Sequence, residues 1–333
     1  MYDIIGDVHG YLSELEHLLR KMDYSVKRGV WSHPTRKAIF VGDFVNRGAD
    51  SKGVISLVRK MVEHGSGFAI LGNHELNAIC YFTYNSKGSP IRRPSLSLAE
   101  ELDAIRIQYQ TDLYEANRLL FKDDIKWLRT LPLFLDFGEF RVAHAYWDDE
   151  AVEVAKKAHD DGRLRKSYLR KLIDKHTLES IAINKLTRGI EYILPHDLII
   201  KCNKGIKRGS FRVKWWQSVE DKTFRESHFG NKFLLPDLTM PKEFFDSESP
   251  YFQPAYSIYH SHLPFLFVGH YCLGGGKNQF PTNNICCVDS CVASGGVLSA
   301  YRYDLGDTKL ETSKMISVAK IVSKNVFSSS LRL

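Results

Sequence analysis

Side chains of the types that bind metal ions recur along the chain, each just after a short run of apolar residues. The runs are "YDII", "KAIFV", "FAIL", "FRVA" and "FLFV", and the residues that follow them are Asp7, His9, Asp43, Asn73, His74, His144 and His270. One such residue alone has an ordinary explanation, because a Gly-Asp pair is common in turns and a single histidine in an apolar run is usually a core residue. Five occurrences in the same context indicate a shared site.

The residue types favour one kind of chemistry. Carboxylate, imidazole and amide ligands without a thiolate suit Mn²⁺, Fe, Zn²⁺ or Ni²⁺ better than a soft metal ion. The two oxygens of Asp43 can bridge two ions, and two ions about 3.5–4 Å apart can share a hydroxide and stabilise an in-line displacement at phosphorus. Arg47, which follows Asp43 by one short turn, offers a planar guanidinium that can hold two phosphate oxygens. We therefore expect two divalent metal ions, Mn²⁺ first among them, and attack on phosphorus by a metal-bound hydroxide.

Strands and helices alternate along the first part of the chain and would bring these side chains together. An apolar helical face follows the first run, and the segment 54–62 repeats that pattern after the second. A third strand leads into a helix expected at 76–81, a mostly helical stretch is expected at 97–131, and a last strand is expected in "GGVLSAYRYD". The alternation predicts a mainly parallel sheet covered by helices. Ligand sites in such sheets lie beyond the carboxyl ends of the strands.

Taken as an ordered set, "GDVHG", "GDFVNRG", "GNHE", "AHA" and "GH" resemble the motifs of the calcineurin-like metallophosphoesterases. The resemblance covers residues 1–150 and 262–305. It is greatest to the branch that holds phosphoprotein phosphatases, bacterial diadenosine tetraphosphate hydrolases and bacterial polynucleotide phosphatases. It implies a four-layered α/β/β/α sandwich, which agrees with the α/β alternation of the sequence.

Carried onto matching positions, the resemblance implies a role for each polar side chain. His74 is the expected general acid that protonates the leaving oxygen, and Arg47 and Asn73 are expected to contact the substrate phosphate. The implied metal ligands are Asp7 and His9 for the first ion, Asp43 as the bridge, and Asn73, His144 and His270 for the second ion.

Asn46 departs from the family pattern. Many phosphoprotein phosphatases carry an aspartate at this position, which pairs with the catalytic histidine. A carboxylate would orient the imidazole and raise its pKa, whereas an amide can orient the ring but adds no charge. We expect Asn46 to weaken the pair with His74 without abolishing it. Such an enzyme would favour leaving groups that need little protonation, such as a nucleotide or an aryl phosphate.

The segment 146–262 is expected to be an insertion over the active-site rim of a single domain that spans residues 1–333. Part of this segment resembles the bacterial polynucleotide phosphatases, though more loosely than the metal motifs do. Within it, Arg188 is a candidate for a second phosphate-binding arginine. A surface arginine is an equally good interpretation of that residue.

A basic stretch at 201–214 precedes Trp215 and Trp216. Basic residues interleaved with aromatic residues can follow a phosphate backbone and stack on bases. The favoured interpretation is a strand that buries its aromatic face and leaves Arg212 and Lys214 in solvent.

Three further features leave alternatives open. Asp289 could support the metal ligands from behind or could simply form a turn. The six cysteines include no CxxC pair, so we expect buried core thiols rather than disulfides or a zinc site. His260 and His262 are near His270 in the sequence, which leaves a ligand role open for them.

The composition is that of an ordinary globular protein, with 333 residues, 44% hydrophobic and 26% charged. No run approaches the roughly 20 apolar residues of a membrane span. The N-terminus lacks the pattern of a secretion signal, so we expect a cytoplasmic protein with no membrane partner. The net charge of +7 favours anionic partners in general.

The sequence therefore predicts a dinuclear-metal phosphoesterase that acts on phosphomonoesters in the manner of serine/threonine phosphatases. The alternatives are a diadenosine tetraphosphate hydrolase and a polynucleotide 2′,3′-phosphatase. A protein that binds phosphorylated ligands or nucleic acid without turnover is disfavoured, because every expected ligand is present. The expected substrate is a phosphorylated small molecule, a nucleotide or a phosphoprotein, with nucleic acid as a further candidate partner.

Overall fold

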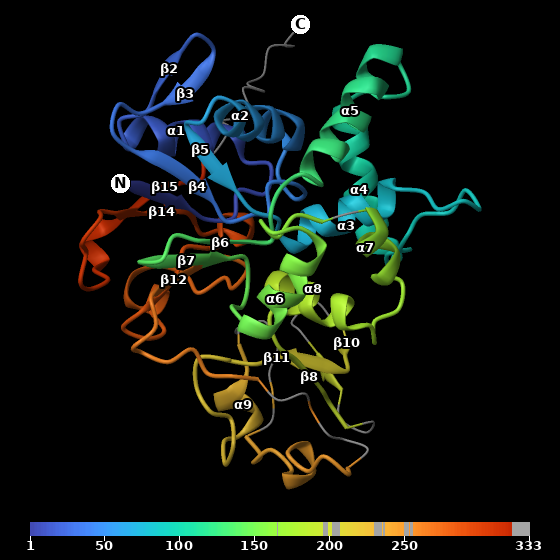
Figure 1. Ribbon diagram of the computed structural model, residues 1–333, viewed down its shortest axis with the longest axis vertical. Helices are drawn as coiled ribbons and strands as arrows, with labels where there is room; N and C mark the ends of the chain where they lie inside the picture. Colours follow the sequence, from blue (N-terminus) through green and yellow to red (C-terminus); the bar gives the residue numbers. More distant parts are fainter. Residues whose placement is uncertain are drawn as a thin grey trace, which may run out of the picture.

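The computed structural model (Figure 1) describes residues 1–164, 166–195, 199–201, 207–229, 235, 237–249, 253 and 256–321. Residues 202–206 of the basic stretch 201–214 lie outside these residues, so what the sequence predicts for that part of the stretch is not tested. In the described part, no helix has both the length and the apolar character that a membrane span requires. The cytoplasmic location, the single domain and the insertion at 146–262 remain predictions.

The first sheet contains the strands that lead to the first three motifs. Its order is β15-β14-β1-β4-β5. The central strands β1 (Tyr2–Ile5), β4 (Lys37–Phe40) and β5 (Gly67–Ala69) run parallel, as the alternation predicts. The remaining strands β14 (Val297–Tyr303) and β15 (Met315–Ala319) are antiparallel to their neighbours, and β15 was not expected from the sequence.

The second sheet contains the strands that lead to the last two motifs. Its order is β13-β12-β7-β6. The strand β12 (Phe265–Val268) lies parallel to both β7 (Phe140–Ala143) and β13 (Ile285–Cys287). The edge strand β6 (Phe134–Asp136) pairs with β7 in an antiparallel hairpin.

The two sheets face each other across a dry, fully buried layer. Ile39, Val41 and Ile70 contribute to this layer from the first sheet and the loops after its strands, and Val142 and Phe267 contribute from the second. The opposite face of the first sheet is covered by α1 (Leu12–Lys21) and α2 (Ser51–Glu63), while α6 (Asp149–Ala158) and α8 (Leu178–Arg188) pack together beside the second sheet (Figure 1). This order of layers confirms the α/β/β/α sandwich.

The remaining helices and strands lie around this sandwich. The stretch expected to be helical divides into α4 (Leu96–Gln108) and α5 (Glu115–Leu128), which project to the right of the sheets in Figure 1 beside α3 (Asn73–Phe82). The smaller elements are β2 (Ser25–Lys27), β3 (Val30–Ser32), α7 (Lys166–Lys171), β8 (Glu191–Ile193), β9 (Ile200–Lys201), β10 (Lys207–Arg208), β11 (Ser210–Arg212), α9 (Phe224–Ser227) and four single 3₁₀ turns at 242–244, 276–279, 292–294 and 312–314.

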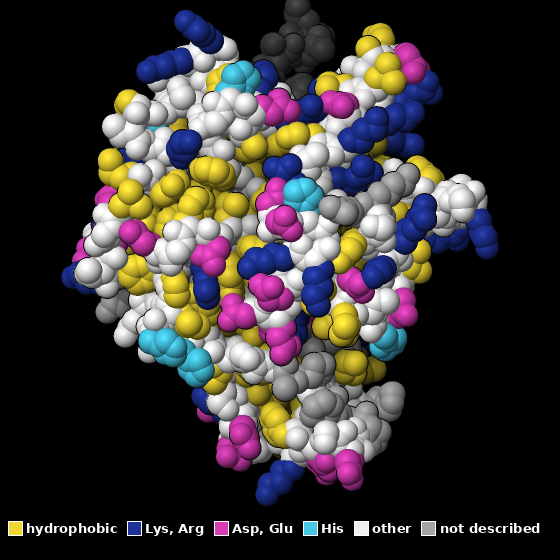
Figure 2. Space-filling model, in the orientation of Figure 1, with side chains coloured by type: hydrophobic (Ala, Val, Ile, Leu, Met, Phe, Trp, Pro, Cys, Tyr) yellow, Lys and Arg dark blue, Asp and Glu magenta, His cyan; other side chains and the backbone are white. Residues whose placement is uncertain are grey.

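Surface charge is mixed on the face presented in Figure 2. Basic side chains gather over α5, which carries Arg118, Lys122 and Lys126, whereas acidic and basic side chains alternate over α6 and α8.

Candidate metal and phosphate site

The strand ends bring the predicted side chains to one pocket. Residues after β1, β4, β5 and β12 line it, namely Asp7, His9, Asp43, Arg47, Asn73, His74 and His270. His144, which follows β7, is completely buried beside them, with its Nε2 3.3 Å from Asp43 Oδ1. The structure therefore brings together every residue that the sequence analysis proposed as a metal ligand.

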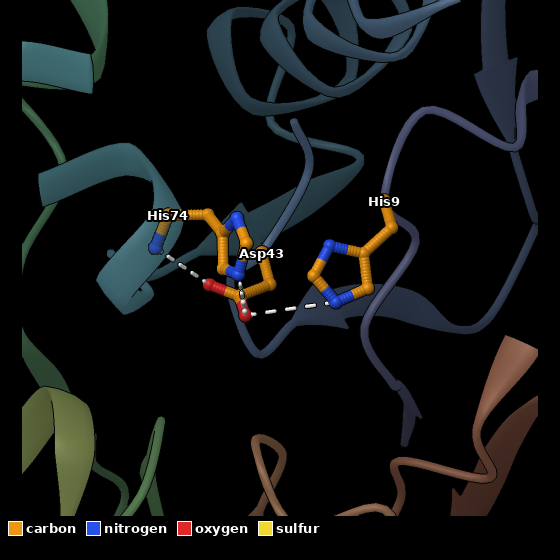
Figure 3. Close-up of side chains that lie close together, drawn as sticks. All are labelled: His9, Asp43 and His74. Carbon is orange, nitrogen blue, oxygen red and sulfur yellow. Dashed lines mark hydrogen bonds and ion pairs between the residues drawn. The ribbon is translucent and has the colours of Figure 1, made fainter. Parts of the chain in front are cut away.

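Asp43 lies at the centre of this arrangement. Figure 3 shows the rings of His9 and His74 turned toward its carboxylate, with their Nε2 atoms 3.7 and 3.9 Å from Oδ2. The backbone N–H of His74 donates to Oδ1 over 3.0 Å. The donor atoms form two buried groups that share Asp43, one with His9 and His74 and the other with His144 and His270. A carboxylate shared between two donor groups has the geometry of a bridging ligand.

The imidazoles are oriented as metal ligands are. His9 Nδ1 donates to Val45 O over 3.2 Å and His144 Nδ1 donates to Val41 O over 2.7 Å, so each ring turns Nε2 toward Asp43. Such second hydrogen bonds fix the ring and leave the other nitrogen free to bind an ion. His270 Nε2 is buried and has no hydrogen-bond partner in the part of the chain that the structure describes. A buried orphan nitrogen beside carboxylates fits a cation.

Acidic groups are crowded in the same place. Burial, followed by the negative charges of Asp289 and Asp43, raises the pKa of Asp7 well above its usual value. Both Asp7 oxygens accept from the backbone N–H of His270, over 3.2 and 3.0 Å. Burial would lower the pKa of His144, but Asp43 and Asp7 outweigh it and raise that pKa to about 10. Buried carboxylates this close require a compensating positive charge, which a protonated histidine or a metal ion can supply.

The turns that carry these residues have unusual backbones. His9, Asp43 and His270 all have positive φ angles, of 49°, 53° and 64°. Such conformations are costly for residues other than glycine and persist where the surrounding structure enforces them. A Cβ atom on Gly72 would overlap the carboxylate of Asp43, and a Cβ on Gly269 would overlap that of Asp7. The glycines in "GNHE" and "GH" thus allow the strand ends to approach the carboxylates.

Glu75 organises two of these turns, and the sequence analysis did not identify it. Its buried carboxylate accepts from the backbone N–H groups of Asp43, Phe44, Val45 and Gly72, over 2.7 to 3.2 Å. Burial, followed by the charge of Asp43, raises its pKa to about 7. The available signal was its position at the third residue of α3, where a glutamate commonly accepts from the backbone before the helix.

Arg47 and Asn46 both contact the expected general acid. Arg47 donates from Nη1 to His9 Nε2 over 3.2 Å and from Nη2 to His74 Nε2 over 3.4 Å. A guanidinium only donates, so His74 Nε2 must accept from Arg47. The neutral ring therefore carries its hydrogen on Nδ1. The Asn46 amide lies 2.9 Å from that atom, and its oxygen would otherwise lack a partner in the described structure, so we assign the oxygen to this contact. Asn46 therefore orients the ring, and burial lowers the pKa of His74 to about 4.

The sequence model of the calcineurin-like phosphoesterases matches residues 2–271 of this chain. The chain belongs to that family. Two curated relatives are both called bis(5′-nucleosyl)-tetraphosphatase PrpE [asymmetrical]. That of Oceanobacillus iheyensis is 51% identical over 73 residues, which are 22% of this chain and 29% of the relative. That of Bacillus subtilis is 31% identical over 147 residues, which are 43% of this chain and 57% of the relative. The chain thus spans between about a third and just over half of their lengths.

Among solved structures, the cold-active protein-tyrosine phosphatase of a psychrophilic Shewanella species is 14% identical to this phosphoesterase. The two superpose with a TM-score of 0.44, over 90% of this chain and 75% of that chain.

Arg188 and Arg212, two arginines of the middle segment, line different pockets. Arg188 donates from Nη2 to Asn77 Oδ1 over 2.6 Å and lines a different pocket, between α3 and α8. Arg212, at the end of β11, lines the metal pocket of this phosphoesterase instead. The expectation that Arg212 extends into solvent holds only in part, because the side chain is 32% exposed while it also lines the pocket. The phosphate-binding role of Arg188 remains a prediction.

The structure also places Trp215, the loop histidines His260 and His262, and Asp289. Trp215 is fully buried, and its Nε1 donates to Tyr271 Oη over 2.8 Å, which confirms the buried-face interpretation over base stacking. His260 and His262 stack on each other in an exposed loop and do not line the metal pocket. Asp289 accepts from the backbone N–H of Cys291, which agrees with a role in the turn, and it also lines the pocket. Its support of the metal ligands remains a prediction.

One cysteine prediction was wrong. Cys272 and Cys291 form a disulfide that joins the loop after His270 to the loop after Asp289. Spacing alone does not reveal it, because the two loops meet only when β12 and β13 pair side by side. Cys80, Cys286 and Cys287 are buried free thiols, as expected.

Proposed function

We propose that this protein is a dinuclear-metal phosphohydrolase whose substrate is a nucleotide phosphoanhydride of the dinucleoside tetraphosphate type. The observation that carries the proposal is the position of Asp43 between two groups of buried donors, with the Arg47 guanidinium beside them. This combination of a shared carboxylate, oriented imidazoles and an adjacent arginine suits hydrolysis at phosphorus.

The residues present fit two divalent ions. We assign Asp7, His9 and Asp43 to the first ion, and Asp43, Asn73, His144 and His270 to the second. We expect Mn²⁺ first, with Fe, Zn²⁺ or Ni²⁺ as alternatives. All four ions accept such mixed oxygen and nitrogen ligands. When bound, two such ions activate the attacking water and neutralise charge on the phosphoryl group.

The chain's own residues would then position the substrate and handle the proton. Arg47 would hold two phosphoryl oxygens with its planar fork, and the Asn73 amide would lie beside them. His74, held through Nδ1 by Asn46, would present Nε2 to the leaving oxygen. Depth of burial at this site keeps the reacting groups away from bulk water, which strengthens these electrostatic contacts.

Asn46 supports a phosphoanhydride over an alkyl phosphomonoester as the substrate. The amide orients His74 but adds no negative charge that would favour its protonated form. A leaving nucleotide phosphate is a much weaker base than a leaving alkoxide and needs little help from a general acid. The names of the two PrpE relatives agree with this choice. No observation favours the expected serine/threonine-phosphatase-like activity over this alternative.

The test uses metal-stripped protein that is reloaded with Mn²⁺, Ni²⁺, Zn²⁺ or Mg²⁺. Each form is assayed on p-nitrophenyl phosphate, bis(p-nitrophenyl) phosphate and diadenosine tetraphosphate, with Asp43→Asn as the matched inactive control. We expect metal-dependent turnover that is fastest on the tetraphosphate and is lost in the variant. A preference for the monoester would return the assignment to phosphomonoesters. Binding of metal and nucleotide without any turnover would indicate a non-catalytic binder.

A further inference from the structure

Arg212 reaches the metal pocket from outside the family motifs. It ends β11, where it pairs with Glu191 of β8 in the antiparallel register. Its backbone carbonyl accepts from the N–H of Phe229 over 2.8 Å, and the preceding Phe211 is buried in the core. The position of the Arg212 backbone is therefore fixed by strand pairing and packing.

The guanidinium of Arg212 has spare hydrogen-bonding capacity. Its Nε atom is buried and forms an ion pair with Glu191 Oε1 at 3.7 Å, but it has no hydrogen-bond acceptor among the described residues. By contrast, Arg188 is held by Asn77, and Arg36 is held by Asp3. A buried donor without an acceptor is costly, and a ligand that supplies the acceptor would remove this cost.

Arg47 and Arg212 reach the metal pocket from different elements. Arg47 contacts His9 and His74 directly. Arg212 comes from β11 and lines the same pocket, together with His270. The pocket around Asp43 is therefore lined by two guanidiniums from different elements, of which Arg47 contacts His9 and His74.

We propose that Arg212 binds the phosphate next to the one that is attacked, so that the pocket recognises a chain of at least two phosphates. This inference rests on the proposed function and adds a residue that selects its substrate class. One phosphoryl group can be held by Arg47 and the metal ions. The adjoining phosphate, which leaves with the nucleotide, carries additional negative charge and lies beyond them.

The same contact would assist the reaction. Charge develops on the bridging oxygen and the leaving phosphate as the anhydride breaks, and a positioned guanidinium would stabilise it. Arg212 would in this way lessen the need for a general acid on anhydride substrates. An alkyl or aryl monoester has no second phosphate and would gain nothing from Arg212.

The test is direct binding, measured by calorimetry on the full-length Mn²⁺-loaded protein at constant excess Mn²⁺. The probes are methylenediphosphonate, which presents two linked phosphonates and is not hydrolysed, and methylphosphonate, which presents one. The variants are Arg212→Ala and Arg212→Lys, with Arg225→Ala as the matched control, since Arg225 is an exposed arginine on the neighbouring α9 and does not line the pocket.

We expect Arg212→Ala to raise the Kd of the diphosphonate about 10- to 100-fold, the loss typical of a charge-assisted hydrogen bond. The Kd of the monophosphonate should change by less than about twofold in the same protein. Arg212→Lys should fall between Arg212→Ala and wild type, because an ammonium keeps the charge but lacks the planar fork. Arg225→Ala should bind both probes as the wild type does.

Equal losses for the two probes would overturn the inference, because Arg212 would then contact the attacked phosphate or support the fold. Unchanged affinity for the diphosphonate would also overturn it. If Arg212→Ala does not fold, as judged by thermal unfolding, Arg212→Lys alone decides by the same comparison. Failure of the proposed function has a separate signature, in which wild-type protein does not cleave diadenosine tetraphosphate but still distinguishes the two probes through Arg212.

Discussion

Replacing Asn46 with aspartate tests the account of the general acid. The side-chain amide lies 2.9 Å from His74 Nδ1, so Asn46→Asp would place a carboxylate oxygen in hydrogen-bond contact with the ring. The backbone need not change, because Asn46 has a φ of 71°, a region that aspartate also tolerates. The substitution therefore changes the charge beside His74 with little change in shape.

The expected size of the effect follows from the pKa of His74, which burial lowers to about 4. At pH 7 only about one ring in a thousand would be protonated at that pKa. A carboxylate in contact raises a neighbouring pKa by about 1 to 3 units, so the protonated fraction rises at least about tenfold. Alkyl phosphates, whose leaving alkoxide must be protonated, should gain at least about tenfold in kcat/KM, while diadenosine tetraphosphate should change by less than about twofold.

The assay compares kcat/KM of the wild type and Asn46→Asp on an alkyl phosphate, an aryl phosphate and diadenosine tetraphosphate between pH 5 and 9. The rate of both proteins on the alkyl substrate should fall as pH rises, because His74 loses its proton. The ratio of variant to wild type should be largest at high pH and should shrink toward pH 5, where the pH approaches the raised pKa of His74 in the variant. Thermal unfolding controls for folding, and metal content controls for the ligand set. Equal changes on all three substrates would refute the reasoning, because leaving-group protonation would then not depend on this pair.

Three further predictions concern the metal ions and the disulfide. Asp43→Asn should reduce bound Mn²⁺ from about two ions per chain to fewer than one, measured by elemental analysis after dialysis, and two retained ions would contradict the bridge. The pKa of about 10 at His144 means that the metal-free ring is protonated below that pH, and metal binding must displace this proton. Metal affinity should therefore rise by up to about tenfold per pH unit between pH 6 and 9, and calorimetry that finds no pH dependence would contradict this. Cys272→Ser opens a loop of 19 residues and should lower the free energy of unfolding by about 3 kcal/mol under non-reducing conditions. Equal denaturant midpoints for variant and wild type would show that the disulfide does not stabilise the fold.

The metal ligands could be predicted from the sequence because two local rules suffice. An apolar run of strand length predicts a strand, and the carboxyl ends of parallel strands meet at one edge of a sheet. Asp7 and Asp43 follow two such strands of the first sheet, so they approach each other once it forms, whereas His270 follows β12 of the second sheet and joins them because the two sheets pack together. The structure adds that the glycines beside these residues are needed, since a Cβ on Gly72 or Gly269 would overlap a carboxylate.

Contacts between distant segments decided the rest. Glu75 is important because its carboxylate reaches back to four backbone N–H groups, three of which belong to a turn some thirty residues earlier. The disulfide exists because β12 and β13 are neighbours, which places Cys272 beside Cys291. Neither feature has a periodic pattern that a linear sequence would display.

Arg188 and Arg212 show the same difference between what the sequence predicts and what tertiary contacts decide. Sequence reasoning named Arg188 as a candidate phosphate-binding residue and placed Arg212 in solvent, whereas in the structure Arg212 lines the metal pocket and Arg188 donates to Asn77. Residue types and strand-end positions were thus set by the sequence alone. Whether Arg212 faces the pocket depends on the register of β11 against β8, because side chains alternate between the two faces of a strand and a shift of one residue would turn Arg212 to the other face.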